Sequence, residues 1–164
     1  MTTCVHRHVP SPVGPLLLTA GDRGLTGIGF ADGSRPAAPP AGSTAGDHPH
    51  LDRAARELAE YFAGKRRKFT VLLAPAGTDF QLQVWAALRT VPWGTTVSYA
   101  DIAARVGRPT AFRAVGLANG RNPLPIVVPC HRVIGASGSL TGYGGGLERK
   151  RSLLELEGVA LRLT

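Results

Sequence analysis

The first half of the chain has the pattern of short strands. Two apolar runs, GPLLLTAG and GLTGIGF, flank the turn sequence GDRG within residues 4–30, and together they predict strands joined by a turn. Residues 31–50 are rich in Pro, Gly, Ala and Ser, so we expect a mobile loop there.

A helix is predicted after this loop. In LDRAARELAEYFAG, residues 51–64, apolar side chains recur at helical spacing until a glycine ends the pattern. The charged run KRRK then leads into the strand FTVLL, and APAGTD, residues 74–79, has the composition of a linker. The pattern therefore predicts an N-terminal α+β domain over residues 1–75.

The second half has mostly helical patterns. The segment FQLQVWAALRTV has one apolar face and follows Thr78 and Asp79, either of which can cap its first turn. The segment RNPLPIVVPCHRVIG holds too many prolines for a helix, and ASGSLTGYGGG predicts a glycine-rich loop. A last helix, LERKRSLLELEG, closes the C-terminal domain, residues 76–164.

Two short helices of this domain are joined by a turn that contains glycine. Ser98 can cap YADIAARVG, in which Gly107 is the expected stop, and Thr110 can cap AFRAVGLANG. This succession predicts a helix-turn-helix.

Composition narrows the class of protein. The 164 residues are 43% hydrophobic, which is enough for a core, and no apolar run approaches the ~20 residues of a membrane span. The N-terminus lacks the pattern of a signal peptide, and the two cysteines are expected to be free thiols in a reducing cytoplasm. A net charge of +8 favours a polyanionic partner, nucleic acid first, although a basic surface also serves solubility.

The stretch PCHRVIG, residues 129–135, carries the candidate chemistry. A thiol attacks as thiolate, so Cys130 would need a nearby positive charge, a base or helix dipoles. His131 and Arg132 offer a base and a charge, and the prolines before Cys130 make its approach stiff. This stretch alone also fits a buried structural cysteine.

His131 and Glu157 each have two interpretations. Neighbouring side chains in an extended chain point to opposite faces, so a turn or a bridging water is needed to connect His131 with Cys130. A carboxylate in the last turn of a helix opposes the helix dipole, so Glu157 needs a partner such as a histidine unless it is simply solvated.

The second helix of the predicted helix-turn-helix surrounds Arg113 with small residues, which are Ala111, Ala114, Gly116 and Ala118. Small side chains would let the helix backbone enter a narrow groove. Ordinary helix packing explains the same pattern, and an exposed arginine is commonly just solvated. The loop TGYGGG fits a lid or a surface loop, and it lacks the lysine of a phosphate-binding loop.

Together these segments resemble the O6-alkylguanine-DNA alkyltransferase (methylated-DNA–protein cysteine methyltransferase) family. The family signature PCHRV is complete, and GTDFQLQVWAALRTVPWGTTVSYADIA, RAVGLANGRNPLPIVVPCHRVIG and TGYGGGLERKRSLLELE follow in the family's order. The resemblance covers residues 78–157 and extends more weakly into SPVGPLLLTAGDRGL and LAEYFAGKRRKF. It implies an α+β protein, with a small ribonuclease-H-like N-terminal α/β domain and a mostly helical, winged-helix-like C-terminal domain.

The resemblance implies a reaction centred on Cys130 as the alkyl acceptor. His131 and Glu157 would form its activating relay, with a water between the histidine and the sulfur. Tyr99 would assist the departure of guanine, and Asn122 would tie the recognition helix to the cysteine loop.

The resemblance also implies contacts with double-stranded DNA that contains alkylated guanine. Arg113 would fill the space left by a flipped base. The other implied DNA contacts are Thr110, Ala114, Asn119 and Tyr99. One wall of the base pocket would consist of Tyr143, Gly144, Gly145, Val133 and Leu140.

Two departures from the family pattern stand out. Gly144 occupies a position where some members carry a serine that donates to the guanine oxygen, so backbone N–H groups would have to serve alone. Some members bind a structural zinc near Cys4, but the second cysteine is absent, and Cys4, His6 and His8 make too small a ligand set. We therefore expect no metal.

The implied reaction transfers an alkyl group from O6-alkylguanine, or less readily from O4-alkylthymine, to Cys130. Its thioether product resists hydrolysis, so we expect one turnover per molecule and no cofactor. We also expect a monomer, with cooperative assembly on DNA left open. Two alternative functions remain open from the sequence. A cysteine hydrolase using Cys130 and His131 would turn over, and a non-enzymatic winged-helix regulator would have no use for the cysteine.

Overall fold

The computed structural model describes residues 4–135, 137–138, 140 and 142–161. It divides the chain into two compact units, of which the first ends at Ala76 and the second begins at Gly77. Within the described part of the chain, none of the helices combines the length and apolar character needed to cross a bilayer.

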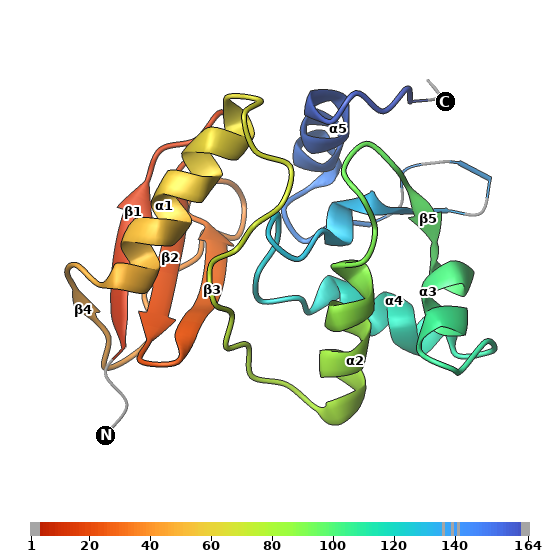
Figure 1. Cartoon of the computed structure of the whole chain (residues 1–164), viewed down its shortest axis with the longest axis horizontal. Coiled ribbons are helices and arrows are strands. Elements are labelled where there is room, and N and C mark those ends of the chain that lie inside the picture. The colour runs from red at the N-terminus through yellow and green to blue at the C-terminus, as the bar shows by residue number, and fades with distance from the viewer. Residues whose placement is uncertain (1–3, 136, 139, 141, 162–164) are drawn as a thin grey trace. The chain divides into compact units, whose positions relative to one another are not determined.

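The first unit is a four-stranded sheet with a helix on one face (Figure 1). The strands are β1 (Val5–Val9), β2 (Leu16–Gly21), β3 (Gly24–Phe30) and β4 (Thr44–Ala45), in the order β3-β2-β1-β4. The pairs β1–β2 and β2–β3 are antiparallel, and β4 joins β1 in parallel. Helix α1 (Pro49–Phe62) lies across β1, β2 and β3 and buries its apolar face on them.

The loop predicted at residues 31–50 packs against the sheet and contains β4, which the sequence pattern did not indicate. The Ala37 N–H donates to the Phe30 carbonyl at 2.8 Å. A Cβ added to Gly29 would lie 2.4 Å from the Cβ of Ala37, so glycine permits this close approach. Strand β2, which lies between β1 and β3, is buried along residues 16–20.

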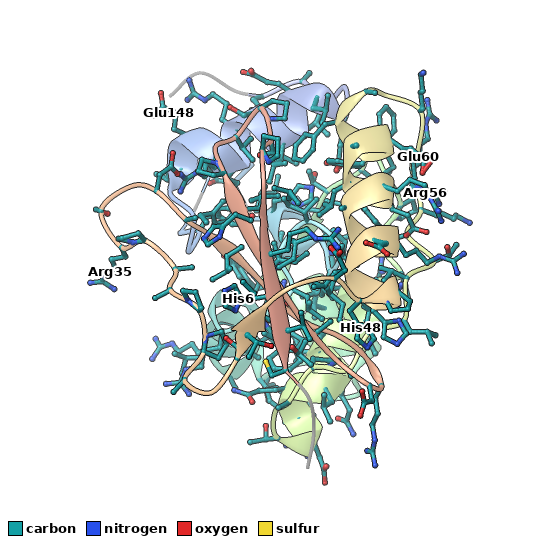
Figure 2. All side chains as sticks on the ribbon, turned by 90° about the vertical axis from the view of Figure 1, so that its left-hand side faces the viewer. His6, Arg35, His48, Arg56, Glu60 and Glu148 are labelled. Carbon is teal, nitrogen blue, oxygen red and sulfur yellow. The ribbon has the colours of Figure 1, made fainter. Side chains whose placement is uncertain are left out.

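Helix α1 begins two residues earlier than predicted, at Pro49. The His48 side chain caps it by accepting the N–H of His50 at 3.2 Å, and proline is well suited to the first helical position. Figure 2 shows His48 at this end of α1, with Arg56 and Glu60 on the side that points away from the sheet.

The strand predicted in the segment KRRKFTVLL is wrong as a paired strand. Only one bridge forms there, between Leu73 and Leu25. The buried carboxylate of Glu57 instead takes the N–H groups of Thr70 and Val71, at 2.8 and 3.0 Å. Side-chain capture of these donors replaces a ladder of backbone hydrogen bonds.

The second unit is mostly helical, as predicted. Its elements are α2 (Asp79–Leu88), β5 (Val97–Ser98), α3 (Tyr99–Arg105), α4 (Phe112–Gly120), the 3₁₀ turn η1 (Cys130–Arg132), β6 (Val133–Ile134) and α5 (Leu147–Leu156). Thr78 caps α2 with a capping box completed by Gln81, which confirms one of the two predicted caps. Strands β5 and β6 form a short parallel pair.

Helices α3 and α4 form the predicted helix-turn-helix, and the cap of α3 by Ser98 is confirmed. Gly107, at φ +76°, accepts the left-handed conformation just after α3. The predicted cap of α4 by Thr110 is wrong, because a turn from Arg108 to Ala111 leaves Ala111 at the cap position with no side-chain hydrogen bond. The Trp85 indole N–H donates to the carbonyl of Ala118 at 2.9 Å and fixes α4 against α2.

Candidate functional site

The proline-rich segment delivers Cys130 through a tight buried turn. Ile126 has φ +76°, which is unusual for a β-branched residue. The Val128 N–H donates to the Leu124 carbonyl at 2.8 Å, and the Cys130 N–H donates to the Val128 carbonyl at 2.7 Å. Cys130 then opens η1, so this residue and His131 lie in a turn and not in an extended strand.

Asn122 holds this turn from the end of α4. Its Nδ2 donates to the Val128 carbonyl at 2.8 Å, and its Oδ1 accepts the Leu124 N–H at 3.0 Å. Its side chain also forms a hydrogen bond with Cys130. The geometry thus connects the second helix of the helix-turn-helix to the cysteine turn through one amide.

The sulfur of Cys130 is held as a thiol. The residue is 5% exposed, and burial raises its pKa to about 11 in spite of the Asn122 hydrogen bond and the charge of Lys150. The thiolate that the sequence suggested is therefore not populated at neutral pH in this closed arrangement.

A buried hydrogen-bonded chain runs from His131 to Arg132 through one carboxylate. The His131 Nε2 lies 2.8 Å from Oε2 of Glu157, and the Arg132 Nε and NH2 donate to Oε1 and Oε2 of Glu157 at 2.8 and 2.9 Å. The third nitrogen of Arg132 donates to the Val91 carbonyl at 2.7 Å. Glu157 forms the C-cap of α5, where a carboxylate opposes the helix dipole. Its hydrogen bonds with His131 and Arg132 offset this unfavourable position.

His131 is a neutral base in this setting. Burial lowers its pKa below the ordinary 6.5, although the Glu157 hydrogen bond acts in the opposite direction. With Nε2–H donated to Glu157, Nδ1 keeps its lone pair, and this buried atom has no hydrogen-bond partner among the described residues. His131 can therefore accept a proton at Nδ1.

Lys150 is a charged residue of the site that the sequence analysis did not single out. Its side chain is fully buried, and Nζ donates to the Val133 carbonyl at 2.6 Å. Burial lowers its pKa to about 8, whereas the nearby Cys130 raises it. The available signal was its position on the buried face of α5, in register with Leu153, Leu154 and Glu157.

The residues predicted to contact DNA differ in exposure. Thr110, just before α4, and Arg113 and Ala114, on α4, are exposed. Asn119 is buried instead, with Nδ2 at 3.4 Å from the Cys130 carbonyl oxygen.

Tyr99 begins α3 and lies against α4. A Cβ added to Gly116 would come within 3.8 Å of its ring. Gly116 therefore permits close packing of Tyr99 on α4, in agreement with the packing interpretation of this helix at that position.

The predicted pocket residues lie around the end of α4 and the start of β6. Val133 is buried, and Leu140 and Tyr143 are half-buried. A Cβ on Gly144 would lie 4.0 Å from the Gly120 carbonyl oxygen, so the glycine-rich loop borders the end of α4. Gly145 accepts a hydrogen bond from Arg149 at 3.2 Å.

The residues that the structure describes contain no group of three His, Cys, Asp or Glu side chains able to hold a metal ion. Both Cys4 and Cys130 are free. The fold and the site define a helix-turn-helix protein that carries a buried cysteine beside a histidine–glutamate pair.

Comparison with known proteins identifies the family. Residues 4–75 match the family model of the ribonuclease-like domain of 6-O-methylguanine DNA methyltransferase, and residues 79–159 match that of its DNA binding domain. The chain belongs to this family.

The chain is 50% identical to the methylated-DNA–protein-cysteine methyltransferase of Methanosarcina acetivorans over 90% of this chain and 94% of that protein. It is 51% identical to the same-named protein of Mycobacterium tuberculosis over 93% and 91%. The crystal structure of Mycobacterium tuberculosis OGT in complex with DNA aligns with a TM-score of 0.86 at 50% identity, covering 94% of this chain and 93% of the other.

Proposed function

We propose that the protein repairs alkylated duplex DNA by moving the alkyl group of O6-alkylguanine irreversibly onto Cys130. One observation carries the proposal: the only cysteine of the family signature PCHRV lies beside a neutral buried histidine whose other nitrogen is fixed by Glu157. The methyltransferase activity for which relatives at about 50% identity are named supports it.

The reaction is a displacement at the alkyl carbon. His131 takes the thiol proton at Nδ1, directly or through a water, and the carboxylate of Glu157 stabilises the imidazolium that results. The sulfur of Cys130 forms a bond to carbon as the bond from carbon to the guanine oxygen breaks. Tyr99 donates a proton to the departing guanine and regains one from solvent.

The product is a thioether, for which water offers no route back to the thiol. The protein is therefore both catalyst and acceptor, acts once per molecule and needs no cofactor. Because Cys130 must remain a reduced thiol, we place the protein in the cytoplasm.

DNA binding belongs to the second unit, which begins at Gly77, in this proposal. The target base has to leave the duplex before its alkyl group can meet the buried sulfur. Arg113, exposed on α4, occupies the vacated space, and Thr110 and Ala114 contact the backbone. The flipped base is received by Val133, Leu140, Tyr143, Gly144 and Gly145.

Intact-protein mass spectrometry tests the proposal. After incubation with a duplex containing O6-methylguanine, one methyl group should be present per molecule and should map to Cys130. Cys130→Ser should gain none, and Cys4→Ser should behave like the unmodified chain. Multiple turnovers, or methyl groups elsewhere, would contradict the proposal.

A further inference from the structure

The outward side of α4 carries an apolar side chain that the reaction described above does not use. Leu117 is 63% exposed, the highest value for a large apolar side chain in the part of the chain that the structure describes. Leu72 of the first unit follows at 62%. Leu117 differs from Leu72 because it lies within the segment that matches the DNA binding domain of the family.

Leu117 shares one side of α4 with Arg113. Four residues along a helix with 3.6 residues per turn lead back to the same side, about 6 Å further along the axis. The opposite side of α4 is buried through Val115, Ala118 and Asn119. The side that carries Arg113 and Leu117 therefore faces away from the core of the second unit and can meet a partner.

The neighbours of Leu117 along this side of the helix are small. They are Ala114 and Gly120, three residues before and after it, and a Cβ added to Gly120 would meet nothing within 4 Å. The leucine is thus the one bulky apolar side chain on an otherwise low surface, as far as the described residues show. Exposed arginines surround it, at positions 108, 113 and 121.

This combination of charge and one projecting apolar group fits the minor groove of a duplex. Arginines attract the phosphates, whereas a leucine gains nothing from a phosphate and needs an apolar surface. The apolar surface of DNA is the face of a base, which becomes accessible only when two stacked pairs separate. Proteins that bind the minor groove insert leucine and similar side chains between base pairs in this way.

Building on the proposed function, we infer that Leu117 enters the minor groove beside Arg113 and wedges apart a base step close to the lesion. Base pairs are stacked about 3.4 Å apart, so an offset of about 6 Å from Arg113 reaches no further than two base pairs from the vacated position. A separated step holds the lesion less firmly in the stack. Leu117 therefore weakens the stack before the base leaves, and Arg113 fills the space after it has left.

The test compares single-turnover rates of methyl transfer to Cys130 on three substrates. They are a fully paired duplex with O6-methylguanine, the same duplex with a mismatch one or two pairs from the lesion, placed on each side in turn, and free O6-methylguanine. Leu117→Ala should slow the reaction on the paired duplex by about fivefold to tenfold, because part of the unstacking is no longer assisted. The loss should stay below about twofold on the free base and on a mismatch that replaces the wedged step, which is already weakly stacked.

Two variants are the controls. Leu117→Met keeps a long apolar side chain and should retain a rate within about twofold of the unmodified chain on the paired duplex. Leu72→Ala removes an equally exposed leucine from the first unit, and it should leave all the rates unchanged. Alanine and leucine are both good helix formers, so α4 itself should persist in Leu117→Ala.

An unchanged rate of Leu117→Ala on the paired duplex would show a solvated leucine only and would overturn the inference. Equal losses on the paired duplex and on every mismatched duplex would show a contact without a wedge, and an equal loss on the free base would show a structural role; both contradict the inference as well. An unmodified chain that takes no methyl group from any of the substrates contradicts the proposed function itself, so the two failures are distinguishable.

Discussion

The Nε2 atom of His131 lies 2.8 Å from Oε2 of Glu157, and both side chains are shielded from solvent. This contact fixes the tautomer of the imidazole, because Nε2 has to carry the hydrogen. The basic nitrogen that remains is Nδ1, and the pKa of the ring lies below its ordinary value. The site thus pairs a neutral thiol with a neutral base.

Replacing His131 by alanine should slow methyl transfer at pH 7 by about 10²–10⁴-fold, the usual contribution of a general base. For the unmodified chain, the rate of methyl transfer should fall at pH values below 6.5, where His131 gains a proton. The rate should be constant between pH 6.5 and pH 9.5, because the pKa of Cys130 is about 11. In His131→Ala only preformed thiolate reacts, so the rate should climb about tenfold per pH unit over this range. Rapid-quench measurements of methyl transfer give both profiles, and parallel profiles would rule out a base at this position.

Replacing Arg132 by methionine should destabilise the second unit by roughly 3–5 kcal/mol, because Glu157 is left as a buried charge with its cation removed. The matched control is Arg151→Met on the exposed side of α5, which should cost less than about 0.5 kcal/mol. Urea unfolding followed by tryptophan fluorescence measures both. Equal urea midpoints for the two variants would show that Arg132 is not needed to stabilise the buried charge of Glu157.

Replacing Glu57 by glutamine should lower the free energy of unfolding of the first unit by roughly 2–3 kcal/mol, since the amide nitrogen that takes the place of Oε2 cannot accept from the Thr70 hydroxyl or from Arg53. Glu60→Gln is the control, because its pair with Arg66 is partly exposed and worth little. Urea titration of the two variants provides the comparison, and similar losses would refute the role of Glu57.

The same carboxylate predicts an acid dependence of stability. Burial raises the pKa of Glu57, but hydrogen bonds from Thr70 and Val71 outweigh it, and the net pKa lies below the ordinary 4.5. Its contribution is therefore complete above pH 4.5 and is lost as the pH falls through the folded-state pKa. Glu57→Gln should flatten this part of the stability curve, and a curve of unchanged slope would count against the assignment.

Replacing Arg113 by alanine should slow repair in duplex DNA by about tenfold to a hundredfold, because base flipping costs a few kcal/mol and the arginine offsets part of it. Reaction with free O6-methylguanine should change by less than about twofold, since no flipping is needed. Arg121→Ala, also exposed but past the end of α4, is the control for general loss of charge. Equal losses of Arg113→Ala on duplex and free base would exclude a flipping role.

The sequence predicted the main helices, the cap at Thr78 and the chemistry at Cys130 because these are encoded locally. A capping box needs residues three apart, and PCHRV is contiguous. The helix dipole indicated that Glu157 needs a partner such as a histidine, but only the family resemblance named His131, since 26 positions separate the two residues.

What the sequence did not predict depends on contacts between distant segments. No local signal indicates that Glu57 would take the N–H groups of residues 70 and 71 and prevent a paired strand. Burial of Lys150 and the raised pKa of Cys130 arise from packing of α5 and η1, elements that periodicity alone does not place together. Asn119 was expected to contact DNA from the family resemblance, and only the fold shows that it is buried on the inner side of α4.

Helix α4 is nine residues long, and a rise of 1.5 Å per residue separates Arg113 from Asn119 by about 9 Å along its axis. So short a rod does not bend, and a misalignment of its outer face is passed undiminished to its inner face. In the proposed reaction, the buried sulfur would therefore meet a flipped base only when the outer face of α4 is correctly placed on the DNA.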